Sequence, residues 1–143
     1  LQEKAPAEAQ RVVAAGYAAG ALGVGAEAAR HERLKALTDK EAASLLPSVP
    51  TLEAAIRKEN DMAGLLRLGY GLVQSGKSEQ GLKLMNEAIK SKQLGERVEE
   101  AKLRLGEAYA FAGNKKQAVA TWRTVGGKDG SADLARYFIM TTK

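Results

Sequence analysis

The chain of 143 residues contains no cysteine and one histidine, and aromatic residues make up 5% of it. The lack of cysteine excludes disulfides, thiol catalysis and cysteine-ligated metal ions. His31 lies among charged neighbours, and the spacing around it supplies neither a nucleophile nor an oriented acid. A single histidine is also a poor ligand set for a transition metal. We therefore expect a protein that is not an enzyme and that has no cofactor or metal ion.

The chain also lacks a long run of strongly apolar residues. The uncharged stretch from Val12 to Ala26 is 15 residues long and mostly alanine and glycine, whereas a membrane span needs roughly 20 apolar residues. The net charge of +5 is modest, and lysine and arginine are interleaved with glutamate. Nucleic-acid-binding proteins usually gather their basic residues on one face. These observations predict neither a membrane span nor a nucleic-acid partner.

Proline is scarce, and none follows Thr51. Alanine and leucine are abundant, whereas valine, isoleucine and threonine are few. This mixture favours helix, because alanine and leucine lose little side-chain freedom in a helical turn. We expect an all-α protein in which residues 1–143 form a single domain.

A repeat with an offset of 37 residues runs through the second half of the chain. It places Leu68-Gly69 on Leu105-Gly106, and it relates four more pairs of small or apolar residues: Gly76 and Gly113, Gly81 and Ala118, Met85 and Trp122, and Ala88 and Val125. Such a period indicates a repeated supersecondary unit. We expect one helical hairpin over residues 61–93, another over 96–127 and a capping helix over 131–142.

Capping residues and glycines set the expected limits of these helices. Asp61 is predicted to cap a helix that ends near Ser75, and Ser78 to cap one that ends near Lys92. In the second hairpin the helices are expected over 96–112 and 115–125. A glycine able to adopt positive φ ends the first helix of each hairpin. Ser131 is predicted to cap the last helix.

The first third of the chain carries a weaker copy of the pattern, because the spacing of Gly69, Gly76 and Gly81 recurs at Gly16, Gly23 and Ala28. Four glycines within ten residues weaken a continuous helix there. The pattern therefore favours a degenerate third hairpin with helices over 7–22 and 26–37. One long alanine-rich helix over 7–37 is the alternative.

Between this degenerate hairpin and the repeat, the sequence predicts two short helices within residues 38–60. Thr38 and Glu41 form a capping box that opens the first of them, which is expected to end at Leu46. Pro47 and Pro50 are predicted to break the chain before the second, over residues 51–59.

The repeat resembles the tetratricopeptide repeat, whose signature includes Leu-Gly, an aromatic residue three positions on, and then alanine followed by a large residue. Leu105-Gly106-x-x-Tyr109 with Ala118-x-x-x-Trp122 fits this signature, and residues 68–85 fit it with substitutions. The chain departs from it by lacking the initial tryptophan and the closing proline, and its period is 37 residues instead of about 34. The resemblance implies a right-handed stack of antiparallel helical hairpins, a TPR-like α-solenoid.

In proteins of this family the first helix of each hairpin lines a concave groove that binds a segment of another protein. The resemblance projects eight residues into that groove: Leu66, Tyr70, Val73, Gln74, Leu103, Glu107, Ala110 and Phe111. Leu66 and Leu103 stand where relatives that clamp a terminal carboxylate have cations, so this groove is apolar. We expect a scaffold or adaptor that binds a protein or peptide partner there. The alternative is a structural subunit whose groove is filled by its own N-terminal segment or by a second copy, as in a homo-oligomer.

Two further features bear on where the protein works. The composition, rich in alanine and glycine, is typical of bacterial proteins, and the chain begins at Leu1 without an initiator methionine. Together with the lack of cysteine, this favours an exported, periplasmic protein over a cytoplasmic one.

Overall fold

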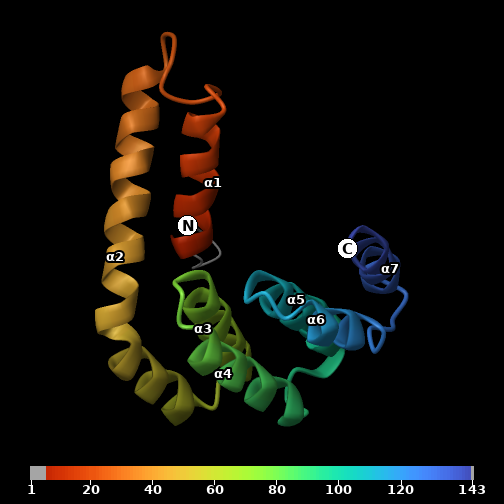
Figure 1. The fold of residues 1–143 in the computed structure, drawn as a ribbon. Coiled ribbons are helices and arrows are strands. Elements are labelled where there is room, and N and C mark those ends of the chain that lie inside the picture. Colours follow the sequence, from red (N-terminus) through yellow and green to blue (C-terminus); the bar gives the residue numbers. More distant parts are fainter. Residues whose placement is uncertain (1–5, 143) are drawn as a thin grey trace.

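The computed structural model describes residues 6–142, and within that range the chain is all-helical, with seven α-helices, one 3-10 helix and no strand. Figure 1 shows their order along the chain. The helices are α1 (Pro6–Ala18), α2 (Ala28–Glu59), α3 (Met62–Gln74), α4 (Ser78–Lys90), η1 (Gly95–Arg97), α5 (Val98–Phe111), α6 (Lys115–Trp122) and α7 (Ser131–Thr141). The expected all-α class is confirmed.

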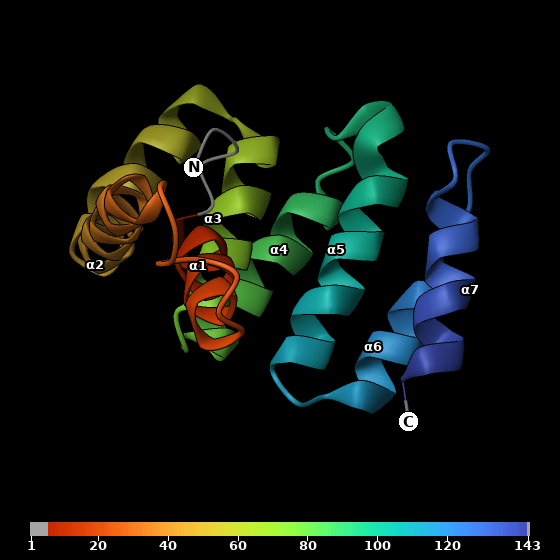
Figure 2. The same ribbon diagram turned by 90° about the horizontal axis from the view of Figure 1, so that it is seen from above.

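The helices predicted from the repeat are present, and each pairs with the next. α3 packs along α4 and α5 along α6, while α4 meets α5 and α6 meets α7. In Figure 2 these helices follow one another in a row that ends at α7. We call this part of the molecule, residues 62–141, the body.

The predicted caps are confirmed in part. The side chain of Asp61 accepts a hydrogen bond of 2.8 Å from the backbone N–H of Gly64, so the cap of α3 is as expected. Ser78 and Ser131 are instead the first residues of their helices, preceded by Lys77 and Gly130 at the cap positions. A cap that the prediction missed is Asn114, whose side chain accepts from the backbone N–H of Gln117 at 3.2 Å.

Glycine allows the two helices of each body hairpin to approach closely. A Cβ added at Gly69 would lie 2.6 Å from the carbonyl oxygen of Gly81 and 2.7 Å from the side chain of Met85. A Cβ added at Gly106 would overlap the indole of Trp122. The two glycines related by the 37-residue offset therefore play the same packing role, which explains why the pattern repeats.

The core of the body is a series of three apolar clusters between successive helices. The first joins α2 to α3 and α4 through Leu45, Val49, Leu65, Leu68, Leu72, Leu84 and Ala88. The second joins the two hairpins through Val73, Met85, Leu105 and Ala108. The third joins the second hairpin to α7 through Leu103, Ala118, Trp122 and Ala135. Each helix is thus held mainly by its neighbours along the chain.

The expectation of two short helices separated by a proline break is wrong, because α2 is continuous from Ala28 to Glu59 and contains Pro47 and Pro50. Proline removes one backbone donor and usually bends a helix, and Figure 1 shows α2 bending in its second half. The carbonyls that lose their donors belong to Ala43 and Leu46, which are exposed and open to water. Burial of Leu45 and Val49 in the first cluster holds the helix on both sides of Pro47.

The predicted capping box at Thr38 is also wrong. Thr38 lies inside α2, 1% exposed. Its hydroxyl donates to the carbonyl oxygen of Lys35 one turn earlier. The hydroxyl therefore finds its hydrogen-bond partner inside the helix and does not cap a helix N-terminus.

Two helices joined by a loop lie where the degenerate hairpin was expected, but the second runs on to Glu59 instead of ending near residue 37. α1 ends at Ala18, and three glycines with positive φ (Gly20, Gly23 and Gly25) lie in the loop before α2. The long-helix alternative is therefore wrong. α1 and the first part of α2 pack side by side and rise away from the body (Figure 1). We call this hairpin, residues 6–46, the arm.

Candidate protein-binding surface

Side chains of α1, α3 and α5 meet where the base of the arm reaches the body. The guanidinium of Arg104 lies 5.4 Å from the ring centre of Tyr70, which bridges α5 and α3. The guanidinium of Arg11 lies 4.6 Å from the ring centre of Phe111, which bridges α1 and α5. Both are cation–π contacts, which are stronger where water is excluded. We call these four residues, together with the nearby carboxylates of Glu8 and Glu107, the junction cluster.

The junction cluster is electrostatically coupled. Burial raises the pKa of the Glu107 carboxyl above its usual range, and the nearby Arg104 cation opposes that rise. Burial also raises the pKa of the Tyr70 hydroxyl, with a further contribution from the carboxylates of Glu107 and Glu8. For Arg104, burial acts to lower the pKa, but Glu107, Tyr70 and Glu8 together raise it overall. The cluster therefore places two acids and two guanidinium groups beside aromatic rings in a partly dry setting.

Of the eight residues projected into a groove, five are exposed or half-buried and lie on or next to the junction cluster. Phe111 is the most open, with 45% of its surface exposed. Tyr70 and Glu107 are half-buried in the junction cluster, and Ala110 is half-buried beside the third core cluster. Gln74, one turn after Tyr70, is half-buried, and its carbonyl oxygen Oε1 is buried without a hydrogen-bond partner.

The other three residues pack in the core, Val73 and Leu103 as buried members of it and Leu66 half-buried against it. Val73 is fully buried in the second cluster. Leu103 is buried in the third cluster, and its backbone carbonyl accepts a hydrogen bond of 3.1 Å from Trp122 Nε1. Leu66 is half-buried and packs against both the first and second clusters. The spacing of residues predicts which face of a helix they share, but not the angle at which neighbouring helices cross it. That angle decides which of these residues are covered.

The sequence reasoning also missed members of this surface. Glu8 and Arg11 are supplied by α1, from which no residue was projected into the groove, and Arg104 of α5 was not projected either. On α7, Leu134 and Tyr137 are 44% and 56% exposed.

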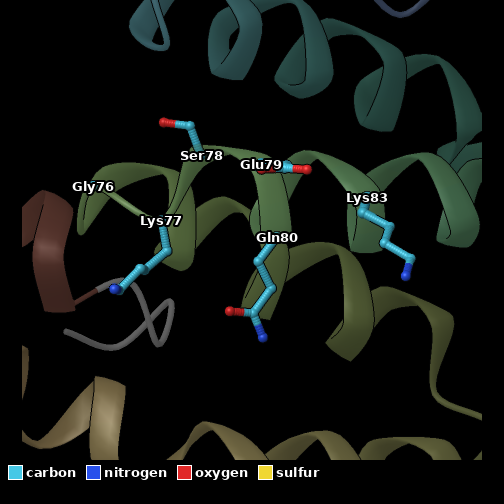
Figure 3. Close-up of a pocket in the computed structure, with 6 residues that line it drawn as sticks. All are labelled: Gly76, Lys77, Ser78, Glu79, Gln80 and Lys83. Atoms are coloured by element: carbon cyan, nitrogen blue, oxygen red, sulfur yellow. The ribbon is translucent and has the colours of Figure 1, made fainter.

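Two shallow hollows lie on α4, away from the junction cluster. Figure 3 shows the first, at the start of α4, with Lys77, Gln80 and Lys83 pointing to one side. It is lined by Gly76, Lys77, Ser78, Glu79, Gln80 and Lys83, and the second by Met62, Lys83, Asn86, Glu87, Lys90 and Ser91. None of the eight projected residues lines either hollow.

Within residues 6–142, no group of three or more histidine, aspartate or glutamate side chains is arranged to hold a metal ion. None of the helices in this part of the chain is both long and apolar enough to cross a membrane.

Comparison of the chain with models of protein families, with curated proteins and with solved structures gave no match. The resemblance to the tetratricopeptide repeat therefore rests on the residues of this chain alone.

Proposed function

We propose that the protein is a non-enzymatic scaffold of tetratricopeptide-like hairpins that binds a segment of a partner protein on the surface formed by α1, α3, α5 and α7. The observation that carries the proposal is Phe111. This large aromatic side chain lies on a first helix of the repeat and remains 45% exposed, although Arg11 covers part of its ring. Aromatic residues in such settings are enriched among the anchors of protein interfaces.

The tetratricopeptide-like character is supported by packing. Gly69 and Gly106, related by the 37-residue offset, each allow the second helix of a hairpin to contact the first. Met85 packs towards the next hairpin, and Trp122, its counterpart, lies 5.2 Å from Phe138 of α7 between ring centres. A right-handed stack of such hairpins has a concave side formed by first helices, which here are α3 and α5, with α7 in the corresponding place.

The chemistry of the surface fits an amphipathic helix or an extended segment with apolar anchors. Phe111, Leu134 and Tyr137 offer apolar contact. Arg11 and Arg104, which lie against aromatic rings, add two guanidinium groups that can donate hydrogen bonds to a partner's carboxylates or carbonyls.

The test is affinity capture from a lysate of the source cells with matched variants. Phe111→Asp places a charge in the surface, and because Phe111 is 45% exposed the fold should survive, which circular dichroism checks. Leu52→Asp makes the same change at a site on α2 that is 41% exposed and serves as the control. We expect one protein to be retained by the wild type and by Leu52→Asp and lost by Phe111→Asp, with at least a tenfold weaker affinity when its binding segment is titrated. Equal retention by all three proteins would contradict the proposal.

A second function, a structural subunit whose surface is covered by its own N-terminal segment, is favoured by one observation. α1 packs against α3, and Arg11 reaches across to cover the ring of Phe111. In this case no protein distinguishes the wild type from Phe111→Asp in the capture experiment. Arg11→Ala would then lower the midpoint of thermal unfolding, since the contact serves the fold alone.

A further inference from the structure

One edge of the arm carries a stripe of four residues at the spacing of a coiled-coil seam. Arg30, Leu34, Leu37 and Glu41 follow one another at intervals of four, three and four residues along α2. Intervals of this kind keep side chains on one face of a helix and fit them to a facing helix. Leu34 is 39% exposed and Leu37 is 45% exposed, so the described chain leaves the stripe open.

Contacts inside the arm place the stripe on one edge of the hairpin, opposite the edge where α1 and α2 are joined by a side-chain hydrogen bond. Gln10 of α1 donates a hydrogen bond of 2.8 Å to Asp39 of α2, which marks the edge where the two helices are joined. Residues two positions apart lie on nearly opposite sides of a helix, at about 100° per residue. Leu37 is two positions from Asp39, and Val12, 63% exposed, is two positions from Gln10. The opposite edge of the arm is therefore apolar on both helices.

The charges at the ends of the stripe make it complementary to itself. Arg30 stands at one end and Glu41 at the other, with the two leucines between them. When two copies of α2 face each other in antiparallel orientation, with a two-fold axis between positions 35 and 36, Leu34 meets Leu37 of the second copy. In the same register Arg30 meets Glu41 of the second copy. Each contact occurs twice, as an isologous interface requires.

We propose that the protein forms a reversible homodimer through this stripe, with the two arms joined as an antiparallel four-helix bundle. The stripe is about 17 Å long at about 1.5 Å of rise per residue, so it buries less than the roughly 800 Å² per partner of a standard interface. The dimer is therefore in concentration-dependent equilibrium with the monomer. Arg30 is free to change partner, because its present ion pair with Glu27 is long, at 3.4 Å, and both side chains are well exposed.

The dimer would bring two copies of the junction cluster into one particle. Because the arm rises away from the body in Figure 1, its outer edge and the surface at Phe111 are different parts of the molecule. A partner with two binding segments would then be held more tightly by the dimer than by the monomer, with no new contact. This proposal does not depend on the proposed function, since the dimer forms whether or not the body binds a partner.

The test is sedimentation velocity from about 1 µM to about 200 µM, a range that covers the affinities of short interfaces. We expect the wild type to shift from monomer to dimer and Leu34→Asp with Leu37→Asp to remain monomeric. Arg30→Glu alone should raise the dimer dissociation constant at least about tenfold, because it faces Glu41 of the second copy with a like charge. Arg30→Glu combined with Glu41→Arg should restore the wild-type constant.

Two controls keep the test specific. Lys83→Glu makes the same reversal of charge on α4, and Phe111→Asp alters the body surface; both should dimerise as the wild type does. Circular dichroism establishes that each variant is folded. A wild type that stays monomeric at the highest concentration would overturn the proposal. So would a dimer that survives the two leucine substitutions, or a double charge reversal that fails to restore association, since either result places the interface elsewhere.

Discussion

The body and the arm are both built from antiparallel helices, yet they bury their side chains differently. In the body, Leu65, Leu72, Val73 and Met85 are essentially inaccessible to solvent. In the arm, Thr38 is the most deeply buried residue, and the buried Leu45 packs in the first core cluster with α3 and α4. The arm meanwhile leaves Val12 and both leucines of its stripe in contact with water. A helical hairpin that is joined to a neighbour on each side completes its core, whereas one that projects into solvent does not.

The two regions also use glycine in different ways. Glycines inside the body helices bring two backbones together around large side chains such as Met85 and Trp122. In the arm loop, glycines adopt positive φ and shape the turn. Glycine thus supports a tight core in the body and shapes turns in both regions, since Gly76 and Gly113 also have positive φ. Each region also leaves large apolar side chains exposed, among them Val12 and Leu37 in the arm and Phe111 and Tyr137 in the body.

The largest expected effect contrasts a buried side chain of the body with an exposed one of the arm. Trp122→Ala should lower the free energy of unfolding by about 3–5 kcal/mol, because it empties the third core cluster. It also removes the donor to the carbonyl oxygen of Leu103. Val12→Ala should change the free energy of unfolding by no more than about 0.5 kcal/mol. Urea unfolding followed by circular dichroism measures both, and comparable losses would end the distinction between the two regions.

A smaller effect separates two glycines of one helix. Gly69→Ala should destabilise the fold by about 1–3 kcal/mol, because the new methyl group meets the backbone of α4. Gly71→Ala should lie within about 1 kcal/mol of the wild type, because it meets only a methyl of the Leu45 side chain, at 3.3 Å. Alanine also favours helix over glycine. The measurement is thermal unfolding of the two variants side by side. If Gly71→Ala were the more destabilised variant, α3 and α4 would not approach each other most closely at Gly69.

Within the body, Glu99 links α5 to the loop that follows α6. The backbone N–H of Gly126 donates to Glu99 Oε2 at 2.5 Å, and this bond, with the help of Lys102, lowers the pKa of the carboxyl. A lowered pKa contributes stability above the unfolded value of about 4.3, and that stability is lost as the pH falls through the folded value. Glu99→Gln should cost about 1 kcal/mol at pH 7. The difference from the wild type should shrink below about pH 4, which thermal unfolding across pH would reveal; a constant difference would count against the bond.

The smallest expected effect concerns Glu107, where the body meets the arm. Burial raises the pKa of this carboxyl, so its ionised form is penalised in the folded state. The penalty is absent below the unfolded pKa of about 4.3 and sets in as the pH rises. Glu107→Gln should therefore stabilise the protein at pH 7, by about 1 kcal/mol or less, and should have no such effect at pH 3. A destabilised variant at pH 7 would mean that the ionised carboxylate supports the arm through Arg104.

Much of the body could be predicted because its signals are local. Asp61 caps α3, and Gly76 and Gly113 follow the first helices with positive φ, as their positions in the sequence suggest. The 37-residue offset also paired residues that turn out to have equivalent packing roles, as at Gly69 and Gly106. These features depend on contacts within one hairpin, which the spacing of residues encodes directly.

The path of α2 could not be predicted from local signals, because tertiary packing overrides them. Two prolines within four residues usually end a helix, yet the burial of Leu45 and Val49 carries α2 past Pro47. The junction cluster was hidden for a related reason. It depends on where the arm stands relative to α5, and nothing in the spacing of Glu8 and Arg11 reports that position.

Amide hydrogen exchange, read by mass spectrometry at a low and a high protein concentration, tests the contrast between the regions most directly. We predict that α3, α4 and α5 are strongly protected at both concentrations, because their contacts lie within one chain. Residues 28–46 should exchange quickly in dilute solution and become protected when the protein is concentrated. Equal protection of the arm and the body in dilute solution would contradict the account, because the arm would then be complete without a second copy.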